Sequence, residues 1–198
     1  MSASDGLNRR RRARSGKSGH GRRDLRPTTS KVRSALFSML GPAGVTGLRV
    51  LDLYAGTGAL GLESLRRGAA QAEFVEKDSR RCEGIRESLR RMRAEDRSKV
   101  HAGDAIALTD RLEGEFDVVF IDPPYAMNPF ERLLGRMEGR GLIARDAVAF
   151  IEHSSQTRLP DMLPGVQIVS RKVYGDTAVS VYRRSDDLAP AVGEEAGA

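Results

Sequence analysis

Val118-Val119-Phe120-Ile121-Asp122-Pro123-Pro124-Tyr125 is the stretch that decides the fold of this 198-residue chain. Its first half is apolar, β-branched or aromatic, and two prolines stop it, which is typical of a buried parallel strand. In open α/β sheets, ligands bind just outside the carboxyl ends of the strands. The Asp-Pro-Pro-Tyr segment therefore lies where a catalytic loop is expected, although a rigid turn without chemistry would use the same residues.

On both sides of this stretch, short apolar runs alternate with segments whose apolar residues recur every three or four positions. The first pattern is typical of strands and the second of helices. Strands are expected over 49–54, 72–75, 99–101, 117–121, 147–151, 166–174 and 177–182, and helices over 31–40, from the turn at 56–61 through 67, 79–94, 105–112 and 129–137. This order predicts a doubly wound, mostly parallel α/β sheet of seven strands with a C-terminal antiparallel hairpin.

Composition excludes several classes of protein. Residues 26–184 are expected to form one domain. Segment 1–25, which has few apolar residues, and the acidic, Pro/Gly/Ala-rich segment 185–198 are expected to be disordered. No run approaches the roughly 18 apolar residues of a membrane span, and no apolar segment of a secretory signal follows the basic N-terminus. Cys82 is the only cysteine, so a Cys/His zinc site is excluded and a cytoplasmic location is expected. Nothing in the pattern predicts an oligomer, so a monomer is expected.

The positive charge is concentrated in one segment. Residues 1–33 hold eleven Lys and Arg against two Asp, a net +9, whereas the rest of the chain carries −3, which gives +6 in all. A basic arm of this kind suits a polyanion, most simply nucleic acid. A solubilising tail with no partner would have the same composition.

A glycine-rich turn follows the first expected strand, in which Asp52 stands among apolar residues. Gly56-Thr57-Gly58-Ala59-Leu60-Gly61 fits the pattern G-x-G-x-x-G and opens a helix, so a ligand could approach backbone N–H groups there. Several nucleotide-binding families share this pattern. Asp52 must be hydrogen-bonded or paired, because an isolated buried charge is costly.

Acidic residues also end the next two expected strands. Glu76 could accept hydrogen bonds from the ribose of an adenosine-containing cofactor, or it could be a solvated surface charge. Asp104 could accept a hydrogen bond from an adenine amino group, or it could cap the helix that follows. Cys82, His101 and His153 are interpreted as packing or strand residues, because none has a partner at the spacing of a metal or catalytic site.

The helix expected over 31–40 has its apolar residues on one face. The simplest interpretation is a helix packed on the edge of the domain. The functional interpretation is that Arg26, Thr28 and Thr29, just before it, project towards a substrate or cofactor.

Together these motifs resemble class I S-adenosylmethionine-dependent methyltransferases. The segment 122–125 is similar to the (Asp/Asn/Ser)-Pro-Pro-(Tyr/Phe) motif of enzymes that methylate exocyclic amino groups of bases. Arg26-Pro27-Thr28-Thr29, the segment 50–63 and Gly175-Asp176-Thr177-Ala178 extend the resemblance over residues 26–182 to the RsmD family of 16S ribosomal RNA guanine-N2 methyltransferases.

The resemblance implies a Rossmann-like fold, S-adenosylmethionine as cofactor, and 16S ribosomal RNA or a small-subunit particle as partner, without a metal. It implies that the Asp122 carboxylate and the Pro123 carbonyl hold the amine, that Pro124 makes the loop rigid, and that Tyr125 stacks on the base. The cofactor-binding residues that it implies are Asp52, Tyr54, Gly56, Gly58, Glu76, Lys77, Asp104, Ala105 and Asp122. The RNA-binding residues that it implies are Arg22, Arg23, Arg26, Thr28, Thr29 and Arg33.

The match is poorest at the N-terminus. There the family's Arg-Gly-Arg-(Lys)-Leu hairpin is reduced to Arg22-Arg23-Asp24-Leu25, and Ser30 stands where an acidic residue is usual. The target nucleotide is therefore open. The alternatives are an amino-methyltransferase acting on another RNA or on DNA, as N6-adenine enzymes do, an NAD-dependent oxidoreductase, which leaves the segment 122–125 unexplained, and a non-catalytic RNA-binding protein of the same fold.

Overall fold

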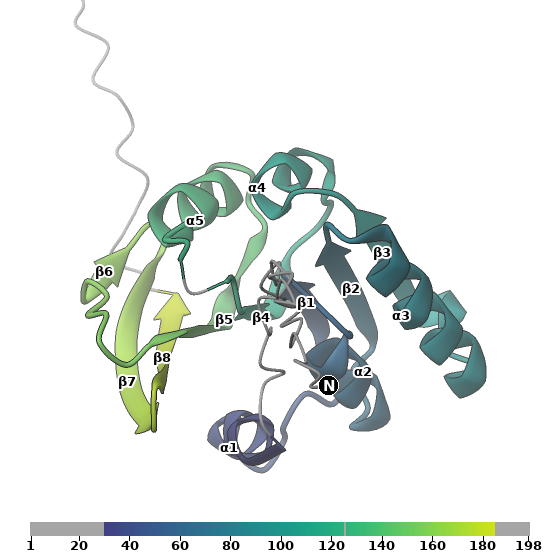
Figure 1. Ribbon diagram of the computed structural model, residues 1–198, viewed down its shortest axis with the longest axis horizontal. Helices are drawn as coiled ribbons and strands as arrows, with labels where there is room; N and C mark the ends of the chain where they lie inside the picture. Colours follow the sequence, from purple (N-terminus) through teal and green to yellow (C-terminus); the bar gives the residue numbers. More distant parts are fainter. Residues whose placement is uncertain (1–29, 125, 185–198) are drawn as a thin grey trace, which may run out of the picture.

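The computed structural model describes residues 30–124 and 126–184. One sheet runs through the molecule, with α4 and α5 on one face and α1 and α2 on the other (Figure 1). The strands are β1 Arg49–Leu53, β2 Gln71–Glu76, β3 Ser98–Ala102, β4 Phe116–Ile121, β5 Ile143–Ser154, β6 Met162–Leu163, β7 Val166–Tyr174 and β8 Thr177–Arg184. The helices are α1 Ser30–Met39, α2 Ala59–Arg66, α3 Ser79–Met92, α4 Ala105–Leu108 and α5 Phe130–Gly139, with 3-10 turns η1 Glu95–Arg97 and η2 Thr109–Arg111.

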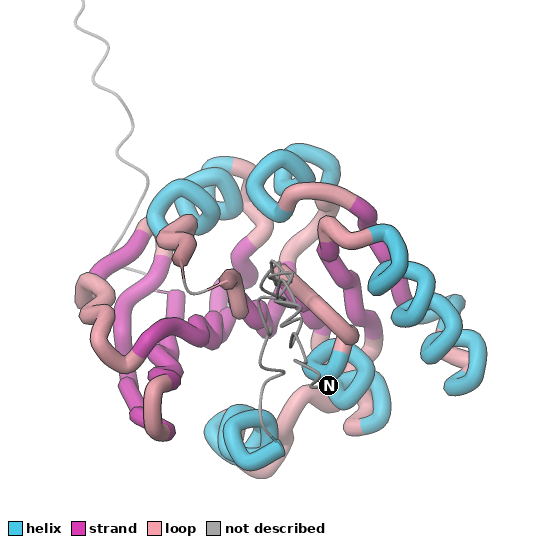
Figure 2. Tube along the Cα trace, viewed as in Figure 1, coloured by secondary structure: helices cyan, strands magenta, loops and turns pink. Residues whose placement is uncertain are grey.

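The strand order in the sheet is β3-β2-β1-β4-β5-β8-β7-β6. The strands from β3 to β5 in this order are parallel, and β8, β7 and β6 continue the sheet as antiparallel strands. Figure 2 shows the strands in magenta between the cyan helices. This arrangement confirms the predicted α/β class, the parallel sheet and the hairpin at Gly175-Asp176.

The predicted number of seven strands is wrong, because the described chain has eight. The additional strand, β6, is only two residues long and pairs with β7, so it is too short to produce a recognisable pattern. The expected helix over 105–112 also ends early. After α4 the chain turns into η2, where the buried Thr109 hydroxyl donates to the carbonyl of Ile106. Strand β5 begins four residues before the expected 147, and the β4–β5 register shifts between Phe116 and Val118.

Two apolar layers cover the two faces of the sheet. In the layer under α1, the rings of Phe120 in β4 and Phe150 in β5 stack with centroids 5.5 Å apart. Phe37 of α1 lies against Phe120 at 5.9 Å. These contacts confirm that the amphipathic helix packs on the sheet, and they fix it beside the strands that carry the expected catalytic loop.

A buried ionic cluster joins the three strands at the other edge of the parallel sheet. Glu73 in β2 is 3% exposed and accepts hydrogen bonds from Arg49 in β1 at 3.2 Å and from His101 in β3 at 2.7 Å. Burial alone raises the pKa of Glu73, but the His101 hydrogen bond and the charges of Lys99, His101 and Arg49 outweigh it and hold the pKa below 4.5. His101 is thus a structural residue, as predicted from the sequence.

In the part of the chain that the structure describes, no helix has the length and apolar character needed to cross a bilayer. The segments expected to be disordered, 1–25 and 185–198, lie outside the described residues.

The ionic cluster predicts an acid-sensitive contribution to stability. Replacing Glu73→Gln leaves Arg49 and His101 without their anion and should lower the free energy of unfolding by about 2 kcal/mol at pH 7. Because the folded pKa of Glu73 is lowered, this contribution is present above pH 4.5 and is lost as the pH falls through the folded pKa.

Urea titrations of both proteins at pH 7 and below pH 4 measure this difference. The control is Glu87→Gln, which removes an exposed pair with Arg91 on α3 and should change stability by less than about 0.5 kcal/mol. A pH-independent loss for Glu73→Gln would contradict the assignment to charge.

Candidate active site

The candidate site lies at the carboxyl ends of β1, β2, β4 and β5. Strand β1 lies between β2 and β4 in the sheet. The strand order continues from β2 to β3 on one side of β1 and from β4 to β5 on the other, so the order reverses direction between β1 and β4. Such a switch point opens a crevice between the loops that follow the strands. The loop after β1 carries the glycine turn and the loop after β4 carries Asp122, so the fold brings these two motifs together. The N–H of Asp122 reaches the carbonyl of Leu53 at 3.4 Å.

Asp52 is buried beneath the glycine turn. It is 2% exposed, and its Oδ2 accepts a hydrogen bond of 2.9 Å from the N–H of Gly61 in the first turn of α2. Burial raises the pKa of Asp52 to about 8, the Gly61 hydrogen bond works against this shift, and the carboxylates of Asp122 and Glu76 add to it. A positive charge bound nearby would favour the ionised form of this carboxyl group.

Glu76 at the end of β2 is also buried, at 8% exposed. One carboxylate oxygen accepts a 2.7 Å hydrogen bond from the N–H of Gly56, and the other accepts a 2.8 Å bond from the N–H of Asp78. The side chain is therefore not a solvated surface charge. Each oxygen keeps further lone pairs that a ligand hydroxyl group can use.

These two carboxylates correct one expectation about the glycine turn. The N–H groups of Gly56 and Gly61 are not available to a ligand, because Glu76 and Asp52 already accept their hydrogen bonds. A pyrophosphate would meet carboxylate oxygens at this helix end, where dinucleotide-binding proteins offer N–H groups. The carboxylate oxygens of Glu76 and Asp52 accept hydrogen bonds and suit a cationic ligand instead. This disfavours the NAD-dependent oxidoreductase.

The glycines themselves are required by packing. Gly58 has φ of 76° just before α2, a conformation that side chains rarely adopt. A Cβ on Gly61 would lie 2.3 Å from Cε1 of Phe74 in β2. The third glycine thus lets α2 pack closely on the sheet and holds the Asp52 hydrogen bond in place.

Tyr54 follows β1 directly and has a strained backbone. Its φ of 60° is unusual for a residue with a side chain, and such strain concentrates at functional sites. Its buried hydroxyl has no hydrogen-bond partner among the described residues. Burial, followed by the charge of Asp104, raises its pKa to about 12. A buried hydroxyl of this kind can donate to a ligand bound beside it.

Asp104 caps α4, because its Oδ1 accepts hydrogen bonds from the N–H groups of Ile106 and Ala107, both at 3.1 Å. This shows the capping role that the sequence left open, and it leaves the second oxygen for a ligand. Ala105 is buried at the start of the same helix, and Lys77 is exposed at the end of β2.

In the expected catalytic loop, Asp122 is half-buried, Pro123 is buried and Pro124 is exposed. The Pro124 carbonyl accepts a 2.8 Å hydrogen bond from the N–H of Met127, which closes the loop into a turn. Arg33 is half-buried on α1. The remaining predicted residues, Arg22, Arg23, Arg26, Thr28, Thr29 and Tyr125, lie outside the described residues.

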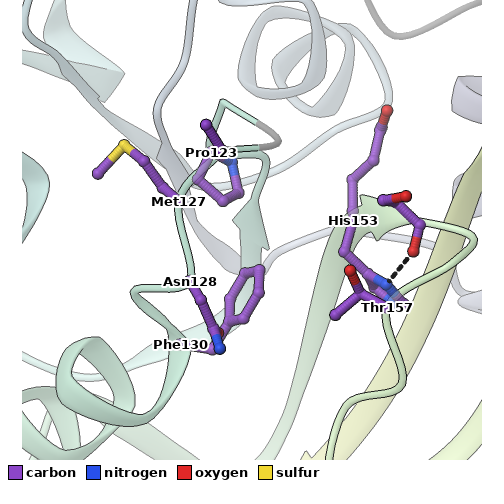
Figure 3. Close-up of a pocket in the computed structure, with 9 residues that line it drawn as sticks. Pro123, Met127, Asn128, Phe130, His153 and Thr157 are labelled. Carbon is purple, nitrogen blue, oxygen red and sulfur yellow. Dashed lines mark hydrogen bonds between the residues drawn. The ribbon is translucent and has the colours of Figure 1, made fainter.

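A cavity of about 190 Å³ lies between this loop and the end of β5. In Figure 3, Pro123, Met127, Asn128 and Phe130 lie on one side of it and His153 and Thr157 on the other. Because a cavity of about 150 Å³ can hold a benzene ring, this one has room for a planar ring of a base.

The wall that β5 contributes was not identified from the sequence. Glu152 and His153 line the cavity, and they are 9% and 4% exposed. The ring of His153 is held by Ser180 at 2.9 Å and by the Ser154 carbonyl at 2.9 Å, and burial lowers its pKa. His153 is therefore a structural residue, as expected, whereas Glu152 is an additional candidate. The available signal was its place at the end of a strand next to the Asp122 strand.

Cys82 is a packing residue, as predicted. It is fully buried in α3, its thiol donates to the Glu76 carbonyl, and burial raises its pKa. Within residues 30–124 and 126–184, no group of three or more His, Cys, Asp or Glu side chains is arranged to hold a metal ion.

Comparisons with known proteins identify the family of the chain. A family model described as "Conserved hypothetical protein 95" matches residues 6–183. The chain is 32% identical over 160 residues to "Ribosomal RNA small subunit methyltransferase D" of Escherichia coli (strain K12), which covers 81% of this chain and 80% of that protein. It is 31% identical over 162 residues to YlbH of Bacillus subtilis (strain 168), covering 80% of this chain and 88% of the relative.

A solved structure of YhhF from Escherichia coli superposes with a TM-score of 0.73 at 31% identity, covering 80% of this chain and 88% of that one. The family resemblance that the motifs suggest is thus confirmed, together with the class I methyltransferase fold. The chain belongs to the conserved hypothetical protein 95 family, which is the RsmD family, and it is a methyltransferase.

Proposed function

We propose that this protein transfers a methyl group from S-adenosylmethionine to the exocyclic N2 amine of a guanine in 16S ribosomal RNA. The observation that carries the proposal is the convergence of Asp122 with two buried carboxylates, Asp52 and Glu76, beside a cavity of the size of a base. The name of the Escherichia coli relative, a ribosomal RNA small subunit methyltransferase, supports the RNA substrate. Ribosomal RNA as substrate also favours a cytoplasmic location.

The cofactor supplies a methyl group on a positively charged sulfur. Asp52 and Glu76 can accept hydrogen bonds from its ammonium and ribose hydroxyl groups, and the free oxygen of Asp104 can accept one from the adenine amino group. Tyr54 offers its hydroxyl without a present partner. Gly56 and Gly58 shape the turn, and Lys77 and Ala105 flank the ribose and adenine positions.

The catalytic task is to present a poor nucleophile in line with the methyl group. The lone pair of an aryl amine is delocalised into its ring, so the amine reacts slowly. We assign to the Asp122 carboxylate and the Pro123 carbonyl the role of accepting its two N–H bonds, which favours a localised lone pair on nitrogen. Pro123 and Pro124 fix the loop, and Tyr125 stacks on the base. The proton that the nitrogen loses on methylation would pass to Asp122 or to water.

On the RNA side, the basic segment 1–25 with Arg22 and Arg23, followed by Arg26, Thr28, Thr29 and Arg33, is the proposed contact to phosphates. Phe37 of α1 packs against Phe120 of β4, the strand that leads into the catalytic loop, and Arg33 lies one helical turn before Phe37. We therefore assign α1 to the RNA-binding side of the site. A paired guanine must first leave its helix to reach the cavity. The small-subunit particle and free 16S RNA are both candidate substrates, and the protein is expected to act as a monomer.

Replacing Asp122→Ala should reduce methyl transfer by at least about 100-fold, because the amine loses the acceptor that activates it. Small-subunit particles that lack the modification are incubated with labelled cofactor, and the nucleosides are identified by mass spectrometry. The expected product of the wild-type protein is N2-methylguanosine. The control Asp110→Ala removes an exposed carboxylate of η2 that pairs with Arg136 of α5. Neither residue is assigned to the site, so this variant should keep full activity.

Two results would contradict the proposed substrate or the proposed catalytic residue. N6-methyladenosine as the product would show that the base is wrong. Unchanged activity of Asp122→Ala would remove Asp122 from catalysis, whichever base is methylated.

Replacing Asp52→Asn should stabilise the free protein while it weakens cofactor binding. The folded pKa of about 8 lies above the ordinary 3.8, so between these values the folded state holds a proton that the unfolded state has lost. Wild-type stability therefore falls as the pH rises through this window, and the variant removes the effect. The gain should be on the order of 4 kcal/mol at pH 7 and about 1–2 kcal/mol at pH 5.

Thermal unfolding at pH 5 and pH 7 measures the gain, and calorimetry with S-adenosylhomocysteine should show at least about tenfold weaker binding. An equal change in stability at both pH values would contradict the burial of an ionisable carboxyl group. An unchanged affinity of Asp52→Asn for S-adenosylhomocysteine would show that Asp52 does not contribute to cofactor binding.

Deleting residues 1–25 should weaken RNA binding and reduce its salt dependence, because basic residues that displace counterions are lost. Filter binding of 16S RNA across a series of KCl concentrations measures the slope, and S-adenosylhomocysteine affinity should stay within about twofold. Equal RNA affinity and slope with and without the arm would mean that the arm does not contact RNA.

A further inference from the structure

Glu152 stands beside Asp122 at the ends of two neighbouring parallel strands. Phe120 pairs with Phe150 and Ile121 with Ile151 in the register of β4 and β5, so the next pair in line is Asp122 with Glu152. The Asp122 N–H bond to Leu53 continues the β1–β4 ladder by one residue. Side chains alternate along a strand, and parallel strands lie about 5 Å apart. Asp122 and Glu152 therefore continue the row of the stacked Phe120 and Phe150 rings.

Glu152 also borders the cavity next to the catalytic loop. It is 9% exposed, and it lines the cavity together with Pro123 of that loop. Its neighbour His153 is fixed by Ser180 and Ser154, and the backbone pairing of Glu152 with Val179 of β8 holds the strand end in the sheet. A carboxylate is thus presented by a rigid element at one side of the position where the amine would be held.

We propose that Glu152 selects guanine by accepting a hydrogen bond from its N1–H, next to the N2 amine that Asp122 holds. This inference rests on the proposed function, and it names the feature of the base that the site reads. Among the common bases, the exocyclic amine is flanked by a ring N–H only in guanine. Adenine N6 is flanked by the bare N1 and cytosine N4 by the bare N3, both of which are acceptors.

A carboxylate beside the amine therefore discriminates in both directions. It accepts the N1–H of guanine in a charge-assisted hydrogen bond, and it repels the ring nitrogen of adenine or cytosine. Sites built to bind a polar hydrogen strongly reject analogues that lack it, because a buried acceptor loses its partner. The Asp-Pro-Pro-Tyr segment does not distinguish the amine of guanine from those of adenine and cytosine. We assign this discrimination to Glu152 of β5.

The test uses 2-aminopurine, which keeps the N2 amine but has an acceptor at N1. After the methylated nucleotide has been mapped, 16S RNA is ligated with either guanosine or 2-aminopurine riboside at that position and assembled into particles. The wild-type protein should methylate the 2-aminopurine particle at least about 100-fold more slowly than the guanosine particle. Glu152→Gln offers an amide N–H to the N1 of 2-aminopurine, so it should lower the preference for guanosine by at least about 30-fold.

Two further variants separate recognition from structure. Glu152→Asp keeps the carboxylate and should keep the preference for guanosine even if its rate falls. Glu138→Gln alters an acid that binds Arg184 at the end of α5, and it should leave the preference unchanged. S-adenosylhomocysteine affinity and thermal unfolding verify that each variant is folded.

The outcomes are distinct. Equal losses by Glu152→Gln on both particles, with the guanosine preference intact, would assign Glu152 a structural role and refute the inference. If the wild-type protein forms no N2-methylguanosine on guanosine particles, the proposed function fails and the inference fails with it. A lowered preference in Glu152→Gln together with a retained preference in Glu152→Asp is the result that supports it.

Discussion

The hydrogen bond from the N–H of Gly61 to the buried carboxylate of Asp52 is the contact on which the rest of the site depends. It ties the first turn of α2 to the middle of the sheet, and it is possible only because Gly61 has no side chain to collide with Phe74. The similar bond from Gly56 to Glu76 ties the start of the turn to β2. The glycine turn is thus folded around two carboxylates, and these would favour hydrogen-bond donors and positive charge in a bound ligand.

This arrangement lowers the free energy of unfolding of the ligand-free protein. A carboxyl group with a pKa of about 8 and a strained tyrosine with a buried hydroxyl both reduce the stability of the free protein. The ionic cluster of Glu73, Arg49 and His101 joins and stabilises β1, β2 and β3 outside the site. Strain at the ligand edge and ionic pairing elsewhere are the combination expected of a preorganised binding site.

Much of the fold could be predicted from the sequence because its signals are local. The apolar run before Asp122 and the glycine turn after Asp52 each indicate the end of a strand. A parallel sheet brings such ends together. Features that depend on pairing between distant segments could not be predicted. The β6 strand is visible only through its pairing with β7, and the partners of Glu73 and of the glycine N–H groups are known only once the strand order is known. Glu152 was overlooked for the same reason, since its meaning comes from the register of β4 with β5.

The position of β8 has a consequence for synthesis of the chain. This strand is the last described in sequence, yet it lies inside the sheet, between β5 and β7. Until residues 177–184 are made, β5 has an uncovered edge and the β6–β7 ribbon has no attachment to the rest of the sheet. Long-range pairing of this kind forms slowly and leaves an edge open to association with other chains. A nascent or truncated chain that ends before β8 would therefore expose the strand that walls the cavity, and we expect such fragments to be substrates for chaperones and proteases before they can act as enzymes.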